Sequence, residues 1–477
     1  MTNVLHQTDV QPPSRTVAFN STLLAAATVV TKILTLAYIL VIARYLGPEL
    51  FGKYSLAYSL VAMLSFGSEL GLASFTVREV AADPSSARLF FSNMLSVRLL
   101  LALATFGVIV ATGHVVSHDS AARLAILIFA VAMVLDAFAE GLTSFFYAFQ
   151  RMAFPSAAAI VRAAVVLGAV CLFAHAGLGL GFIVGATAIG AAATVIILIP
   201  AFGVQFWAPR PGFQSGFVRA MLIAALPYAG MALITNIFFR VDMVMLSWMK
   251  GDVETGLYGA AYRIMESLLF VAVAVNSASL PAMSRVLVAS PGDVGDLFRR
   301  PFRWLVWLGL PMAVGLTALA RPIMGLFGPG FVDAAPCLRV LAWALMLMFV
   351  NRFTGTLLTA AGRQGMLVKL CAVVLVANVV LNLLLIPRYG RMGAAWVTLL
   401  CECGFLPTLL LLSRRYLDLG RLRKGLWRPC LAAAGMGGFC WYFGGLSLLA
   451  LVPCGAAVYG LLLAATYLLR AETGGAG

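Results

Sequence analysis

Charged residues inside long apolar stretches are the part of this sequence best suited to chemistry. The stretches contain six basic and six acidic residues: Lys32, Arg98, Arg162, Arg240, Arg263 and Arg352, and Glu69, Asp136, Glu140, Asp242, Glu266 and Glu402. A charged side chain at the centre of a bilayer costs about 2.5–3.5 kcal/mol on insertion scales. Charges at such positions therefore indicate either a polar path for a ligand or ion pairs that hold helices together.

Three of these cations lie beside side chains that form hydrogen bonds. Arg352 lies one helical turn before Thr356, and Arg240 lies one turn after Asn236. Lys32 shares a helix face with a run of threonines. We expect five residues to line a polar path and bind its ligand: Lys32, Arg240, Arg352, Asn236 and Thr356.

Two spacings predict contacts between charged side chains. Arg263 and Glu266 are three residues apart on one helix face, which favours a structural or gating ion pair. Asp136 and Glu140 are four residues apart, so their carboxylates should meet, and like charges in a poorly solvated site favour the retention of one proton. This pair is a candidate for ion coupling. The alternative is that one or both carboxylates lie near a helix end in water and titrate ordinarily.

The other charges give simpler expectations. Asp242 is only two residues from Arg240 and points elsewhere on the helix, so we expect it to pair across helices. Arg98 and Arg162 are long enough to extend to the inner membrane surface.

The elements that must position these charges are membrane-spanning helices. Of 477 residues, 62% are hydrophobic and 11% are charged, which excludes an ordinary soluble domain. A span needs roughly 20 apolar residues, and uniformly apolar runs of that length favour helices over barrel strands. We predict an all-α integral membrane protein with about fourteen transmembrane helices, at 17–43, 53–72, 91–113, 121–147, 156–177, 180–206, 219–247, 257–281, 302–327, 335–361, 366–387, 392–413, 428–445 and 446–469.

The basic residues predict the orientation of these helices. Nineteen of the 33 Lys and Arg residues fall in loops assigned to the cytoplasm and eight in outer loops and edges, a bias that orients membrane proteins. Both termini should then be cytoplasmic, in a multi-pass protein of the bacterial inner membrane. The net charge of +15 reflects this bias and an attraction to anionic lipids, and no loop is large enough to form a nucleic-acid-binding module.

One short pattern occurs twice. "GPELFGKYSLAY" at 47–58 and "GDVETGLYGAAY" at 251–262 share G-x4-G-x-Y-x2-A-Y at an offset of 204 residues. Locally this is a turn, in which Gly47 and Gly251 end one helix while Tyr54 and Tyr258 anchor the next at the membrane surface. Six predicted helices separate the copies, so the two halves enter the membrane the same way up, as a parallel repeat.

The repeat predicts two pseudo-repeated lobes around a central cavity. We expect a cytoplasmic tail at 1–16, an N-terminal lobe at 17–206, a cytoplasmic linker at 207–218, a C-terminal lobe at 219–413, a basic loop with two appended helices at 414–469, and a second tail at 470–477.

Catalytic signatures do not emerge from this sequence. No serine, cysteine or carboxylate stands in a recognisable nucleophile motif, and the cysteines and histidines lack the spacing of metal ligands. We therefore expect no enzyme, no cofactor and no metal site. Internal repeats in a helical bundle are instead typical of secondary transporters.

Three longer segments carry a family resemblance: "ARYLGPELFGKYSLAYSL" at 43–60, "RVDMVMLSWMKGDVETGLYGAAYRIMESLLF" at 240–270 and "NLLLIPRYGRMGAAWVTLLCE" at 382–402. They resemble the lipid-linked oligosaccharide (O-antigen, Wzx-type) flippases of the multidrug/oligosaccharidyl-lipid/polysaccharide exporter superfamily. The resemblance implies fourteen helices in two lobes and transport of an undecaprenyl-diphosphate-linked oligosaccharide by alternating access, for export of an O-antigen or an exopolysaccharide.

The implied partners are the lipid-linked oligosaccharide and membrane lipids, with a polysaccharide polymerase and glycosyltransferases as further partners and no nucleic acid. A multidrug or organic-cation exporter of the same superfamily is the main alternative, and its cavity should be acidic or aromatic. A membrane glycan polymerase or ligase is a weaker alternative, because the predicted outer loops are short.

Overall fold

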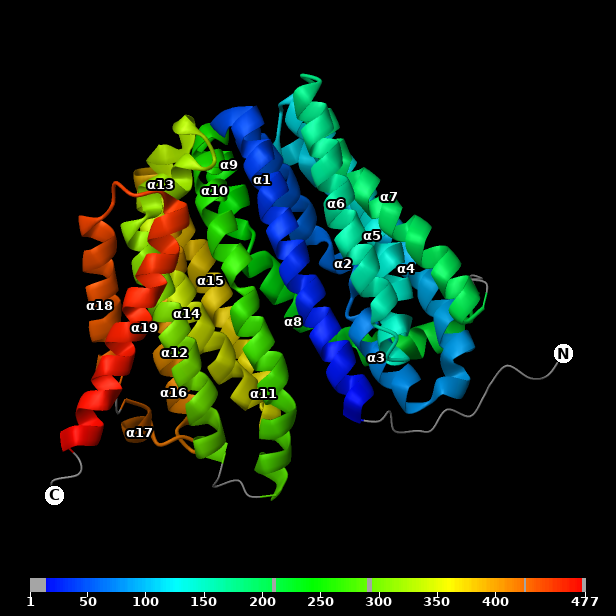
Figure 1. The fold of residues 1–477 in the computed structure, drawn as a ribbon. Helices are drawn as coiled ribbons and strands as arrows, with labels where there is room; N and C mark the ends of the chain where they lie inside the picture. Colours follow the sequence, from blue (N-terminus) through cyan, green and yellow to red (C-terminus); the bar gives the residue numbers. More distant parts are fainter. Residues whose placement is uncertain (1–13, 208–211, 290–293, 424–425, 474–477) are drawn as a thin grey trace. The chain divides into compact units, whose positions relative to one another are not determined.

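The computed structural model describes residues 14–207, 212–289, 294–423 and 426–473, and every regular element in these ranges is a helix (Figure 1). Parts of the predicted tails and linker, at 1–13, 208–211 and 474–477, lie outside the described residues. Eleven described stretches are long and apolar enough to cross a membrane. One of them, Thr22–Ala82, holds two predicted spans, and α12 and α18 account for the other two. The predicted helical membrane fold is confirmed.

The chain forms two compact units, which we describe separately. The N-terminal unit consists of the described parts of Met1–Val41 and Val61–Leu233. Its helices are α1 (Ser14–Leu64), α2 (Phe66–Glu69), α3 (Leu72–Ala82), the 3-10 turn η1 (Pro84–Ser86), α4 (Ala87–Val116), α5 (Ser120–Ala148), α6 (Ala153–His175), α7 (Leu180–Gln205) and α8 (Ser215–Phe238). Residues 42–60 of α1 and 234–238 of α8 belong to the other unit.

Aromatic packing holds the N-terminal unit together at one end of α4, α5 and α7. The Phe91 ring stacks on Phe202 with centroids 4.4 Å apart and meets Phe145 edge-on at 4.9 Å. Such pairs contribute about 0.5–1.5 kcal/mol each beyond the area that they bury. Direct side-chain packing of this kind matters in lipid, where apolar helices gain little from avoiding the solvent.

The C-terminal unit consists of Ile42–Leu60 and the described part of Ile234–Gly477. The most extensively buried of its long helices is α14, which packs against α10, α11, α12 and α16. The unit contains α9 (Val241–Lys250), α10 (Asp252–Leu268), α11 (Phe270–Ala289), α12 (Val294–Ala318), α13 (Ala320–Gly325), η3 (Pro329–Ala334), α14 (Ala335–Ala360), α15 (Gln364–Tyr389), α16 (Arg391–Ser413), α17 (Leu419–Arg423), α18 (Trp427–Tyr442) and α19 (Leu448–Thr473).

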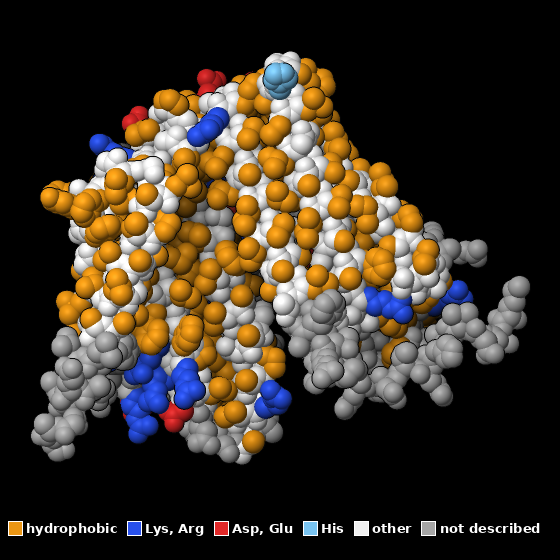
Figure 2. All heavy atoms as spheres, in the orientation of Figure 1, with side chains coloured by type: hydrophobic (Ala, Val, Ile, Leu, Met, Phe, Trp, Pro, Cys, Tyr) orange, Lys and Arg blue, Asp and Glu red, His pale blue; other side chains and the backbone are white. Residues whose placement is uncertain are grey.

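The surface of the C-terminal unit has the polarity expected of a membrane protein. Hydrophobic side chains cover the flanks of its helices, and Lys and Arg gather near the helix ends around α17 (Figure 2). The exposed basic residues of this region are Arg300, Arg414, Arg415 and Arg421. Basic residues of this kind favour a cytoplasmic loop, and that orientation remains a prediction.

The sequence repeat is also a structural repeat. Gly47 (φ 70°, ψ 175°) and Gly251 (φ 83°, ψ −173°) adopt nearly the same left-handed backbone conformation, and each separates two helical segments. Glycine reaches this region without the steric cost that a Cβ atom adds. Eighteen residues later both copies break again, at the equivalent positions Ser65 and Leu269. The turns predicted at Gly47 and Gly251 are therefore present.

The two copies pack directly against each other within the C-terminal unit. A Cβ atom on Gly256 would lie 2.9 Å from the carbonyl carbon of Pro48, and one on Gly52 would lie 3.0 Å from the Cα atom of Asp252. If each residue is replaced by its equivalent in the other copy, 204 positions away, one contact becomes the other. The contact is therefore reciprocal. Further along, Gly259 lies against its own equivalent, Ser55. From this reciprocal pair to the Ser55–Gly259 contact, the packing advances in the same direction along both helices, as expected for a parallel repeat.

Two expectations about this region need correction. Tyr54 and Tyr258 are 2% and 0% exposed, so they are packed inside the protein rather than anchored at the membrane surface. Residues 42–60 group with the C-terminal unit because they pack on α10. The lobe boundaries that we derived from the sequence remain a prediction, except that this segment crosses from one unit to the other.

Candidate functional site

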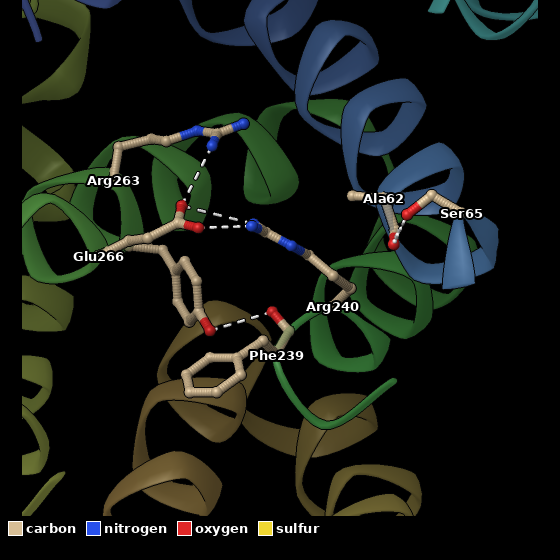
Figure 3. A network of polar contacts seen from close by, with 7 residues as sticks. Ala62, Ser65, Phe239, Arg240, Arg263 and Glu266 are labelled. Carbon is tan, nitrogen blue, oxygen red and sulfur yellow. Dashed lines mark hydrogen bonds and ion pairs between the residues drawn. The ribbon is translucent and has the colours of Figure 1, made fainter. Parts of the chain in front are cut away.

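A broken helix creates the centre of the candidate site in the C-terminal unit. The sequence predicted one span at 219–247, but the helix stops at Phe238 and resumes at Val241. Such a break leaves backbone carbonyls without helical partners, and in a membrane they need another donor. The Tyr262 hydroxyl of α10 donates to the Phe239 carbonyl at 3.0 Å (Figure 3). Broken helices of this kind frequently line binding sites in transporters.

Two arginines share one carboxylate beside this break. Arg240 directly precedes α9, and its guanidinium reaches Glu266 of α10 (Figure 3). Arg263, three residues before Glu266, donates from Nη1 to Oε2 at 3.1 Å. Both guanidinium groups also lie over the Tyr58 ring, at 4.9 Å for Arg240 and 3.9 Å for Arg263. We call these four residues the cationic cluster.

The cationic cluster carries a net positive charge that solvent can reach in part. Two guanidinium groups face one carboxylate, which leaves one positive charge in excess. The side chains of Arg240, Arg263 and Glu266 are 11%, 10% and 26% exposed. The arginines are therefore held in place but retain an accessible edge. An anionic group with oxygen acceptors suits such a pair of planar donors.

The predicted Arg263–Glu266 ion pair is present, and its gating role stays a prediction. The Arg240–Glu266 contact was missed because the residues are 26 positions apart. Tyr58 and Tyr262 were missed as well. They are equivalent tyrosines of the two repeat copies, and this equivalence is the sequence feature that could have identified them.

Arg352 lies near the same break but makes a different contact. Its guanidinium lies 4.9 Å from the centre of the Phe239 ring. The Thr356 hydroxyl donates to the Arg352 carbonyl at 3.0 Å, back into its own helix. Threonine hydroxyls inside membrane helices commonly donate to a backbone carbonyl one turn earlier in the same helix. Thr356 is therefore a weaker donor to a ligand than its spacing suggested.

Asp242 does pair across helices, but with a tyrosine rather than a cation. It accepts a hydrogen bond from the Tyr258 hydroxyl of α10 and another from the backbone N–H of Met243 at 2.8 Å. The Tyr258 oxygen also lies 3.3 Å from the Thr398 hydroxyl of α16. This buried network ties α9 to α10 and α16.

The last two predicted ligands, Lys32 and Asn236, are both partly exposed. Lys32 lies on α1 in the N-terminal unit, and no ion pair is found for it among the described residues. The neighbouring Thr28 and Thr31 hydroxyls donate to carbonyls of their own helix. Asn236 lies on the last turns of α8, in the C-terminal unit. Their role as ligands remains a prediction.

In the N-terminal unit the predicted carboxylate pair is divided between two arginines. Arg162 of α6 binds Asp136, with Nη2 donating to Oδ2 at 2.9 Å. Arg98 of α4 donates from Nη2 to Glu140 at 2.8 Å. Each carboxylate therefore has its own arginine partner, and a role of Asp136 and Glu140 in ion coupling stays a prediction. The Arg98 side chain is 1% exposed, so it does not extend out of the protein as expected, whereas that of Arg162 is 35% exposed and is held by Asp136.

These features define a class of protein: a repeat-built helical membrane protein with a broken helix and charged residues within its spans. Its fold is similar to a solved structure of the lipid II flippase MurJ in an inward closed conformation, with a TM-score of 0.76, 16% identity, and coverage of 94% of this chain and 99% of that one. It is also similar to an inward-facing multidrug resistance MATE family transporter of the MOP superfamily, with a TM-score of 0.69, 14% identity, and coverage of 85% and 99%.

Sequence comparison gives the family. Residues 17–287 match the polysaccharide biosynthesis protein family, and residues 227–384 match the MatE family. The first match covers more than half of the chain, so the chain belongs to the polysaccharide biosynthesis protein family. The superfamily recognised from the sequence is confirmed.

Two relatives illustrate the range of this similarity. The succinoglycan biosynthesis transport protein ExoT of Rhizobium meliloti (strain 1021) is 28% identical over 312 residues, which cover 63% of this chain and only 60% of that relative's length. The probable low-salt glycan biosynthesis flippase Agl15 of Haloferax volcanii is 21% identical over 364 residues, which cover 75% of each chain.

Proposed function

We propose that this protein is a flippase that translocates an undecaprenyl-diphosphate-linked oligosaccharide across the bacterial inner membrane by alternating access. The glycan would serve surface polysaccharide export, in a pathway that includes a polysaccharide polymerase and glycosyltransferases. Membership of the polysaccharide biosynthesis protein family supports this proposal. The names of two relatives, one a succinoglycan transport protein and the other a probable flippase, point the same way.

The observation that carries the proposal is the charge of the cationic cluster. A diphosphate headgroup must leave water to cross the membrane, and each charge in an apolar layer is costly. Arg240 and Arg263 share Glu266 and keep one positive charge in excess. Planar guanidinium groups bind phosphate oxygens in a bidentate manner, so this pair suits a diphosphate. In this proposal Arg352, Lys32, Asn236 and Thr356 are further contacts along the path.

The Arg263–Glu266 pair has a second role in the proposal. When the diphosphate binds, its oxygens compete with Glu266 for the two guanidinium groups. The ion pair would then open on binding and close again after release, as a gate. Two lobes at 17–206 and 219–413 would rock between inward and outward states, with both termini in the cytoplasm.

An exporter of organic cations is the second candidate, because residues 227–384 match the MatE family. Such cargo would prefer Glu266 to the arginines. The sign of the charge therefore separates the two functions. A glycan polymerase or ligase has no specific observation in its favour.

Leaflet translocation in proteoliposomes tests the proposal, with an undecaprenyl-diphosphate-linked oligosaccharide as the probe. Arg240→Ala and Arg263→Ala each make the cluster neutral, and a hydrogen bond to a charged group contributes about 1.5–3 kcal/mol. We therefore expect flux to fall at least about tenfold, whereas Glu266→Gln, which keeps both guanidinium groups but removes the ionic gate, should lower flux less than either arginine variant. Arg339→Ala, at an exposed position on α14, is the control.

The opposite pattern would exclude this function. If the wild-type protein moves no diphosphate-linked glycan but extrudes organic cations, and Glu266→Gln abolishes that extrusion, the protein is a cation exporter. Size-exclusion profiles and thermal unfolding of each purified variant establish that the lost flux does not reflect lost folding.

A further inference from the structure

Tyr58 contributes an aromatic face to the cationic cluster. The Cζ atoms of Arg240 and Arg263 lie 4.9 and 3.9 Å from the centre of its ring. The face of an aromatic ring is electron-rich, so it attracts cations, and it does so most strongly where little water is present. The two arginine side chains are only 11% and 10% exposed. Both contacts with the ring therefore help to hold the arginines in place.

A ring and a carboxylate hold an arginine with different consequences for its charge. A carboxylate such as Glu266 neutralises one guanidinium, whereas an uncharged aromatic ring neutralises none. In the N-terminal unit, Arg98 and Arg162 each face a carboxylate of their own. The Tyr58 ring instead contacts two like charges, and it leaves the excess positive charge of the cluster to a ligand.

Close helix packing places Tyr58 beside the arginines. Ser55, one turn before Tyr58, lies against Gly259 of α10, where an added Cβ atom would be 3.1 Å from the Ser55 Cβ. Arg263 and Glu266 follow Gly259 by one and two turns of α10. Residues three or four positions apart share a helix face. The contact that joins the two helices therefore also directs the Tyr58 ring towards the cluster.

Tyr262 is the equivalent of Tyr58 in the second repeat copy, and it acts on the other end of Arg240. The Tyr262 hydroxyl donates to the Phe239 carbonyl at 3.0 Å, which fixes the backbone directly before Arg240. The Tyr58 ring contacts the guanidinium of the same arginine. The repeat thus supplies one tyrosine for the backbone at Arg240 and another for its charged group.

We propose that Tyr58 is a positioning residue that keeps Arg240 and Arg263 in their binding arrangement after a ligand displaces Glu266. The identity of that ligand, a diphosphate, rests on the proposed function. Glu266 is the most exposed of the three charged side chains, at 26%, so an incoming anion reaches it and replaces it. The ring stays in contact with both guanidinium groups. The diphosphate then meets two ordered arginines, and binding does not pay the full entropy cost of ordering them.

The concentration dependence of flux in proteoliposomes tests this role, with an undecaprenyl-diphosphate-linked oligosaccharide as the probe. Tyr58→Leu removes the ring, so the concentration that gives half-maximal flux should rise about tenfold, with a much smaller change in maximal flux. Tyr58→Phe keeps the ring and should restore the wild-type concentration. Tyr459→Leu is the matched control, because it removes another buried tyrosine, whose hydroxyl donates to the Trp307 carbonyl at 2.9 Å.

The control variant should lose thermal stability without a change in the half-maximal concentration. An unchanged concentration in Tyr58→Leu would overturn the proposal. Equal impairment of Tyr58→Phe and Tyr58→Leu would overturn it as well, because the hydroxyl rather than the ring would then be the group that acts.

Thermal unfolding in detergent tests the positioning without any transport substrate. Glu266→Gln leaves the two guanidinium groups with the ring but without the carboxylate. Tyr58→Leu should therefore lower the unfolding midpoint more in the Glu266→Gln background than in the wild-type background, whereas Tyr459→Leu should act equally in both. Equal effects of Tyr58→Leu in the two backgrounds would contradict the positioning role. If the effects differ but the wild-type protein moves no diphosphate-linked glycan, Tyr58 positions the arginines and the proposed function fails.

Discussion

Charged residues within the spans are tolerated because most of them have a partner on another helix. Arg98 pairs with Glu140 and Arg162 with Asp136, each between neighbouring helices of the N-terminal unit. Polar groups contribute as well, as when Asn351 donates to Glu402 at 2.7 Å. Because an unpaired charge in the membrane is costly, each pairing also fixes which helices lie side by side.

The hydroxyl of Tyr258 helps to hold neighbouring helices together, and its removal should lower the stability of the protein measurably. Tyr258→Phe leaves Asp242, which is 3% exposed, with one donor fewer. Losing a hydrogen bond to a buried charged group costs about 1–3 kcal/mol. We expect a lower midpoint of thermal unfolding in detergent than for the wild-type protein. Tyr389→Phe, at an exposed position, is the control. Equal midpoints for the two variants would mean that the network does not contribute to stability.

At the level of helices, the sequence predicted positions well and interruptions poorly. All fourteen predicted ranges fall on helical segments, because long apolar runs leave the chain few alternatives in lipid. The turns at Gly47 and Gly251 were predictable from glycine. The breaks after Leu64, Phe238 and Leu268 occur without proline or glycine at the break itself, and they depend on tertiary partners such as Tyr262. The same distinction applies to the charge pairs. The Arg263–Glu266 pair is local and was predictable, whereas the Arg240–Glu266 pair joins distant residues and was not.

The reciprocal contact between the repeat copies should be sensitive to a single methyl group. In Gly256→Ala the new Cβ would meet the backbone of Pro48, which cannot rotate away, so the helices must separate. Overpacking of this kind typically costs about 1–3 kcal/mol. Gly259→Ala should cost less because it meets the movable Ser55 side chain, and Gly168→Ala, with open space around it, should be neutral. Equal thermal stability of all three purified variants would contradict the close packing.

At the scale of the whole molecule, the parallel repeat and the distribution of basic residues together predict one orientation of the chain in the membrane. An even number of spans between the copies places the turns at Gly47 and Gly251 on the same side of the membrane. The excess of Lys and Arg in the alternate loops predicts that this side is the outside. An inverted repeat would instead place the two turns on opposite sides.

Labelling of equivalent positions in intact cells tests this orientation. Glu49 and Val253 correspond under the repeat offset, and both are exposed. On a cysteine-free background, Glu49→Cys and Val253→Cys should both react with a membrane-impermeant maleimide added outside. Gln150→Cys, in the exposed turn between α5 and α6, should react only after permeabilisation. Labelling of only one repeat position would indicate inverted halves. Labelling of Gln150→Cys alone would reverse the orientation and place the termini outside, so that the basic loops would no longer face the cytoplasm.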